Sequence, residues 1–261
     1  MFPLGSRFGL SDSRDQSLLF WILCGVATVG SIFATLALTA SGWHTGFGTT
    51  LTATIAVVLG AYLPLAARLS GMRALAILLM PYLCLLALLS AVWGGGMEGP
   101  PDLMTADAPP AWLALHISVA LGAFALLTLA AVAALAGFLQ ARALKRRKPT
   151  ALTRRLPALA EADALTLRLL ASAEAVLGLG LISGMAVEYF ASGSLIVLDH
   201  KTLLSWTAFL LIGLLLAARS LYGLRGQAAA RFVLLAQLLL TLAFPGVKFV
   251  SDVLMQTPTT G

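Results

Sequence analysis

Charged residues are scarce in this chain of 261 residues, of which 11% are Asp, Glu, Lys or Arg and 59% are hydrophobic. A soluble domain carries about 25% charged residues, so the composition excludes a soluble protein and indicates one whose solvent is the lipid bilayer. Cysteine is also scarce: Cys24 and Cys84 each lie inside an apolar stretch. The chain has no C-x-x-C motif of the thioredoxin type and no C-x-x-C-H motif, so it is not itself a c-type cytochrome. We expect both cysteines to be packing residues.

Motifs for bond-making chemistry are missing as well. The chain has no Gly-rich phosphate loop, no H-E-x-x-H and no nucleophile elbow, so we do not expect an enzyme. The net charge of +6 comes from bases in short loops between apolar stretches. That placement is typical of the positive-inside rule for membrane proteins, and we expect no nucleic-acid partner.

Long apolar runs are what the chain does contain. They predict an all-α, polytopic transmembrane helix bundle, because only helices and closed barrels satisfy the backbone in lipid. The expected organisation is a polar tail (1–17), one bundle (18–254) and a short second tail (255–261), with the first run retained as a span. Residues 156–170 predict a short amphipathic helix on the membrane surface. The seven expected spans are 18–40, 49–67, 74–93, 111–140, 169–190, 201–218 and 232–253.

Charge alternates between the loops and orients the bundle. The N-terminus and the loops after the second, fourth and sixth spans are basic, most strongly over 142–148, whereas the other loops are neutral or acidic. The positive-inside rule therefore predicts a cytoplasmic N-terminus and an external C-terminus. We expect a multi-pass membrane protein with this orientation.

The three histidines, His44, His116 and His200, all fall at the external face on this topology. Imidazole is a common ligand of metals and of haem iron, so His116 and His200 are candidate iron ligands and His44 is a weaker one. The other interpretation is that they are hydrogen-bonded packing residues. Trp112 and Trp206 stand close to them, either as an interfacial aromatic belt or as walls against a flat macrocycle.

Polar residues near the spans leave further alternatives open. Asp199 and Lys201 flank His200; they are either solvated charges at a helix start, with Asp199 as N-cap, or groups that contact the carboxylates of a ligand. Glu174, within the fifth span, is a functional candidate by its position, although Arg168 or Ser172 could satisfy it. The small residues of 180–184 (G-L-I-S-G) predict close helix packing.

Five short motifs, in order, resemble the cytochrome c assembly family that includes CcsA and CcmC, and most of all its short branch known as YpjD. They cover about residues 111–254, which we expect to be the assembly-like part of the bundle. The motifs are L-H-I at 115–117, L-P-A-L with Asp163 and Leu165, G-L-I-S-G at 180–184, D-H-K-T at 199–202, and Y-G-L-R-G at 222–226 followed by F-P-G-V-K-F at 244–249.

The resemblance implies haem binding at the outer surface and presentation of haem to apocytochrome c. It implies His116 and His200 as axial ligands, with Trp112, Trp206, Asp199 and Lys201 around the haem. The chain departs from the larger members: it has no Trp-rich W-D-P-K-E motif and no histidine after its last span, and Ala217 stands where they place a membrane-embedded histidine. The resemblance therefore implies a haem-handling protein of the bacterial inner membrane that works with apocytochrome c or other assembly subunits. The alternative is an accessory membrane subunit that regulates a partner such as a cation transporter, with structural histidines.

Overall fold

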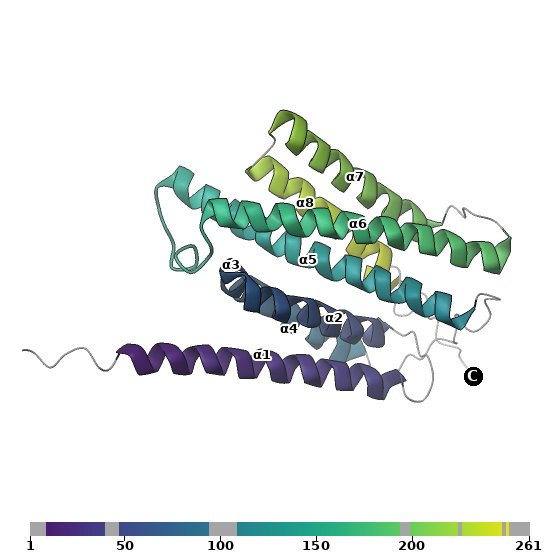
Figure 1. The fold of residues 1–261 in the computed structure, drawn as a ribbon, viewed down its shortest axis with the longest axis horizontal. Helices are drawn as coiled ribbons and strands as arrows, with labels where there is room; N and C mark the ends of the chain where they lie inside the picture. The colour runs from purple at the N-terminus through teal and green to yellow at the C-terminus, as the bar shows by residue number, and fades with distance from the viewer. Residues whose placement is uncertain are drawn as a thin grey trace, which may run out of the picture.

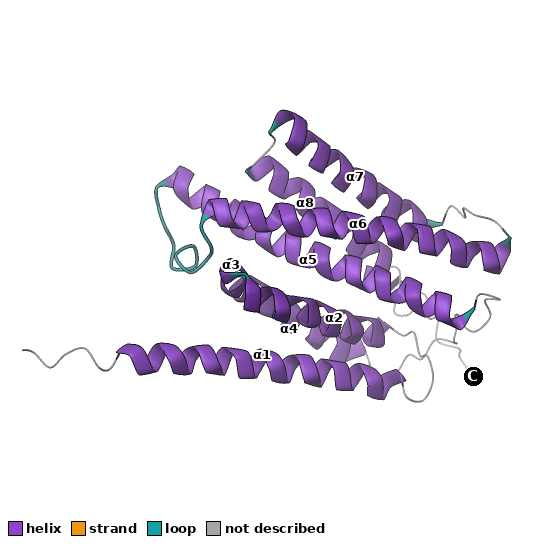
Figure 2. Ribbon diagram, viewed as in Figure 1, coloured by secondary structure: helices purple, strands orange, loops and turns teal. Residues whose placement is uncertain are grey.

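The computed structural model describes residues 9–39, 47–93, 109–193, 199–223, 226–246 and 249–250, and all regular structure in them is helical (Figure 2). In these residues, seven helices are long and apolar enough to cross a membrane. The prediction of an all-α polytopic bundle is confirmed. The elements are α1 (Gly9–Thr39), α2 (Phe47–Arg68), α3 (Ser70–Ala74), α4 (Ala76–Trp93), α5 (Pro110–Arg146), α6 (Leu159–Ser192), α7 (His200–Tyr222), α8 (Gln227–Thr241) and the π-helix η1 (Leu242–Gly246).

The helices run side by side along the long axis of the molecule (Figure 1). At the left of that view, α5 ends and α6 begins, joined by a loop that carries basic residues; we call this the basic end. At the other end α5 and α7 begin and α6 finishes; we call this the histidine end. The helix α1 begins at the basic end and α8 runs away from it, as an odd number of spans requires.

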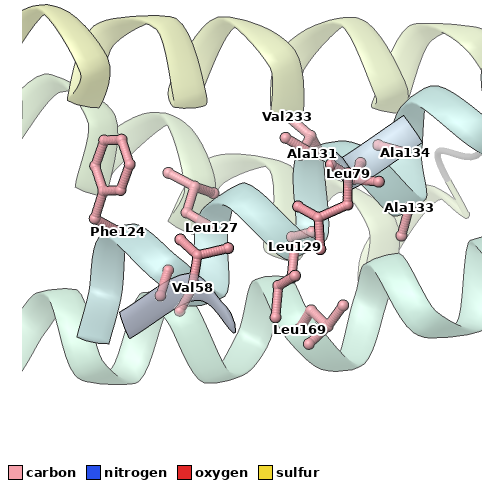
Figure 3. Packing of buried hydrophobic residues seen from close by; sticks show 14 of the residues in the cluster. Val58, Leu79, Phe124, Leu127, Leu129, Ala131, Ala133, Ala134, Leu169 and Val233 are labelled. Atoms are coloured by element: carbon pink, nitrogen blue, oxygen red, sulfur yellow. The ribbon is translucent and has the colours of Figure 1, made fainter. Parts of the chain in front are cut away.

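Helix α5 is the central element of the bundle. It packs on α6 along its length and also contacts α2, α4 and α8, and 72% of its most apolar window is buried. Its buried stretch is rich in alanine, which lets neighbouring backbones approach closely. Leucine and valine side chains from α2, α4, α6 and α8 fill the space around it (Figure 3).

The first helix lies at the margin of the bundle. It packs mainly on α2, and only 11% of its apolar window is buried inside the protein. Large apolar side chains such as Phe33 and Val29 point outward. In a membrane these side chains contact lipid, which is an apolar solvent for them.

Two expected boundaries were wrong. Residues 159–167 do not form a separate surface helix; they are the first turns of α6, because no glycine or proline interrupts the helix there and Ala162 and Leu165 are buried in the core. The fourth span continues past Gln140 into the basic cluster and ends at Arg147, whose φ is 52°. Pro149 follows, and a proline disfavours a helical residue before it.

The two cysteines differ in environment. Cys24 is buried against the core, as predicted, whereas Cys84 is exposed on α4. The interpretation of Cys84 as an internal packing residue was wrong, because α4 turns that face away from α2 and α5. His44, the loop over 94–108, Arg225 and residues 251–261 lie outside the described residues.

Candidate functional site

The contact between α5 and α6 is built around two glycines of the 180–184 motif. A Cβ added to Gly180 would lie 3.7 Å from Val119 of α5, and one added to Gly184 would lie 2.9 Å from Cε1 of His116. The absence of side chains at these positions lets α5 and its imidazole approach the backbone of α6. The prediction that Gly180 and Gly184 line a helix contact is confirmed.

The imidazole of His116 is held by the serine between those glycines. Its Nδ1 lies 3.0 Å from Ser183 Oγ, and Ser183 Oγ donates its own hydrogen to the Gly180 carbonyl oxygen at 3.0 Å. A hydroxyl has one hydrogen to donate, so Ser183 must accept the other bond and Nδ1 must carry the proton. The Ser183 hydroxyl therefore favours the Nδ1–H tautomer of His116.

That tautomer leaves Nε2 of His116 with a lone pair. The side chain is half-buried, and no described residue makes a hydrogen bond to Nε2. The fully buried polar side-chain atoms that lack a partner in the described part of the chain are Glu174 Oε2 and Gln237 Oε1. Nε2 of His116 is not one of them, so this nitrogen is not fully buried and a ligand can reach it. A neutral imidazole whose second nitrogen is fixed by an acceptor is the usual form of a histidine that ligates a metal.

The start of α7 brings three of the predicted residues together in sequence and in space. Asp199 is the N-cap, and its carboxylate accepts the backbone N–H of Thr202 at 2.7 Å. Partial burial raises the pKa of Asp199, whereas the hydrogen bonds from Thr202 and the charges of Lys201 and His200 lower it. The lowering effects are together larger, so the pKa lies below its ordinary value. The expected N-cap is confirmed, while His200 and Lys201 are exposed beside it.

The two tryptophans occupy different surfaces. Trp112 lies one turn before His116 on α5 and is 38% exposed. Trp206 is half-buried on α7 and packs edge-on against Phe209, with ring centroids 6.3 Å apart. Phe209 in turn covers Gly178 of α6, where a Cβ would lie 3.2 Å from the ring.

Helices α5 and α7 both pack on α6 and α8, and the pair α5–α7 is not among those in broad contact. Gly184, which faces His116, and Gly178, which faces Phe209, are six residues apart and thus about 120° apart around α6. The histidine of α5 and the aromatic pair of α7 therefore use different faces of α6. His116 takes its described partner from α6, and joint ligation by His116 and His200 stays a prediction.

Glu174 lies apart from the histidines. Its Oε1 is 2.9 Å from the position of a Cβ on Gly213 of α7, and its buried Oε2 has no hydrogen-bond partner among the described residues. Neither Arg168 nor Ser172 satisfies it, contrary to the suggestion from sequence. Nine residues separate Glu174 from Ser183, which is about 14 Å along a helix, so Glu174 does not belong to the His116 site.

At the basic end, polar contacts that the sequence alone did not predict join the motifs. Arg219 of α7 forms a two-pronged ion pair with Asp163, with Nη2–Oδ2 at 2.7 Å and Nη1–Oδ1 at 3.1 Å. The side-chain amide of Gln140 donates to the backbone carbonyls of Thr153 at 2.8 Å and Pro157 at 3.1 Å. These bonds fix the α5–α6 loop. These contacts could have been anticipated in part, because Pro157 and Asp163 both belong to the motif of L-P-A-L with Asp163 and Leu165 identified in the sequence.

A bundle of seven membrane-spanning helices with a fixed imidazole at one end defines a multi-pass membrane protein with a candidate ligand site. The family model described as cytochrome C assembly protein matches residues 15–255. The chain belongs to this family, and the match includes the first three spans as well as the region of the five motifs. Membership indicates a role in cytochrome c biogenesis.

Among curated proteins, the chain is similar to an uncharacterized 28.8 kDa protein in the nifR3-like 5' region of Azospirillum brasilense. The two are 45% identical over 249 residues, which cover 95% of this chain and 91% of the relative. No solved structure matches the chain significantly.

Proposed function

We propose that this protein handles haem at the histidine end of the bundle during cytochrome c assembly, with His116 as an iron ligand. The observation that carries the proposal is the chain of contacts from His116 Nδ1 through Ser183 Oγ to the Gly180 carbonyl. It orients the ring and leaves the Nε2 lone pair free. Haem, when bound, would supply an iron with axial positions for such a nitrogen.

The surrounding residues are compatible with this group. Trp112 presents an exposed indole one turn from His116, and the exposed Lys201 is a cation at the same end of the bundle that could pair with a propionate. We propose His200 as the second ligand candidate, since it is exposed at the start of α7 and free to reorient. The family implies haem and apocytochrome c as partners, and the charge pattern favours the external face of the bacterial inner membrane.

A titration of the detergent-purified protein with haemin tests the assignment. We expect a Soret band that is lost in His116→Ala and weakened in His200→Ala. In His116→Gly, added imidazole should restore the band, because the free base can occupy the vacated ligand position. The matched control is Leu115→Ala, an exposed neighbour on the same helix, which should bind haem normally.

Two results would contradict the proposal. An unchanged Soret band in His116→Ala would remove this residue from the site. A wild-type protein that binds no haem but co-purifies with a membrane transporter would favour the accessory-subunit alternative, in which the His116–Ser183 contact only joins α5 to α6.

A further inference from the structure

A groove of about 270 Å³ lies at the basic end between the α2–α3 connection and α6. Its sides are Arg68, the last residue of α2, and Arg168 of α6, while Leu69 and Ala164 contribute apolar surface between them. The groove therefore joins cationic rims to an apolar floor.

Both arginines are available to a ligand. They are exposed, and neither guanidinium has a hydrogen-bond or ion-pair partner among the described residues. The carboxylate in the groove, Glu161, lies against the backbone of α3 at Gly71 and already has a partner of its own. One carboxylate stands against two guanidinium groups in this lining, so the groove keeps a net positive charge.

The depth of the groove matches the lipid headgroups. Arg68 is the residue at which the second span ends, so the groove lies where apolar helices leave the hydrocarbon. An unpaired guanidinium there favours a phosphate oxygen, because its planar fork can donate two hydrogen bonds. An apolar floor beside a pair of cations is complementary to a phosphate that carries acyl chains, and a free phosphate ion would leave that floor uncovered.

We propose that this groove binds the phosphate of an anionic membrane lipid, with Arg68 and Arg168 on the headgroup and Leu69 and Ala164 against the lipid chain. The lipid would bridge α2 of the N-terminal helices and α6 of the C-terminal helices, which otherwise meet at this end through the short α3. Basic pockets between helices on the cytoplasmic side commonly bind such lipids. The inference does not depend on haem handling.

Native mass spectrometry of the detergent-purified protein with equal amounts of phosphatidylglycerol and phosphatidylcholine, matched in their chains, tests the proposal. We expect the wild type to retain one phosphatidylglycerol. The double variant Arg68→Gln with Arg168→Gln should lose the preference by roughly 30-fold, and each single variant by about 5-fold. The control double variant, Arg154→Gln with Arg155→Gln, removes the same charge from exposed positions of the α5–α6 loop outside the groove and should keep the preference.

Three outcomes would overturn the proposal. Equal losses in the two double variants would mean general attraction to a basic surface. Full displacement of the lipid by inorganic phosphate at millimolar concentration, with the same thermal shift, would indicate a free-phosphate site. Unchanged retention in the single variants, which serve if the double variant does not fold, would exclude both arginines.

Discussion

Replacement of Gly184 by alanine probes the contact on which the candidate site depends. The new Cβ would lie 2.9 Å from His116 Cε1, whereas carbon atoms in ordinary contact are about 3.5–4.0 Å apart. The ring must therefore retreat by at least about 0.6 Å. A retreat of that size can lengthen the distance from Nδ1 to Ser183 Oγ from 3.0 Å to at most about 3.6 Å, which weakens or breaks the hydrogen bond.

The energy follows from three terms. Overpacking of a closely packed contact costs about 1–3 kcal/mol, and the lost hydrogen bond costs about 0.5–1.5 kcal/mol. Alanine in place of glycine inside a helix stabilises the folded state by about 0.5–1 kcal/mol. Together these three contributions mean that Gly184→Ala should lower the free energy of unfolding by about 0.5–4 kcal/mol.

Gly180 is the matched control, because it lies on the same helix and in the same interface. A Cβ there meets Val119 at 3.7 Å, an ordinary contact, so Gly180→Ala should be neutral or stabilise the protein by up to about 1 kcal/mol. Unfolding of both variants by a denaturing detergent, followed by circular dichroism, measures the difference. Haemin titration of the same samples reports whether the imidazole has moved.

Equal stability of the two alanine variants would refute the reasoning, since the argument depends on the 2.9 Å and 3.7 Å clearances. A destabilised Gly184→Ala that still bound haemin with unchanged affinity would separate the packing role of His116 from ligand binding. It would count against the proposed function and leave the helix contact intact.

Three further predictions address other parts of the bundle. Removal of Asp163 by alanine should cost about 1–3 kcal/mol, because the half-buried guanidinium of Arg219 loses both carboxylate bonds; a double-mutant cycle in detergent unfolding should give a clear coupling energy, and additive effects would contradict the pair. Asp199→Ala should cost about 1 kcal/mol at neutral pH. Since the folded pKa of Asp199 is lowered, its contribution is present above the ordinary carboxyl range and disappears as the pH falls through the folded pKa, so the wild type and the variant should converge in acid; a constant gap would contradict the cap. Topology reporters should be external after Gly261 and cytoplasmic within 142–148, and the reverse result would place the histidines on the wrong side of the membrane.

Local chemistry made several features predictable. The seven spans follow from apolar length, because lipid cannot satisfy a free backbone. Asp199, which stands just before the apolar run of the sixth span, predicts an N-cap from the chain alone. The glycines at 180 and 184 predict a helix contact because their effect depends only on missing side chains.

The partners across the bundle were less accessible. The sequence left His116 as either an iron ligand or a hydrogen-bonded packing residue, and it did not indicate a partner; the described partner is Ser183, 67 residues away. Asp163 was a motif residue without a known role until Arg219 was found beside it. The expectation of a surface helix separate from the fifth span was wrong, since α6 runs without a break from Leu159 to Ser192. A helix that leaves the membrane can continue in water if its inner face is still buried.

The amino-acid sequence by itself determined how many times the chain crosses the membrane, which loops are basic and where α7 is capped, because each of these depends on hydrophobicity or on neighbours within one helical turn. Only the tertiary structure decided that α5 is central, that Ser183 fixes the tautomer of His116, and that Arg68 and Arg168 share one groove. Those properties depend on how helices far apart in the chain rotate against one another. In an apolar bundle, that rotation is set by the combined fit of many small side chains, which no single stretch of sequence contains.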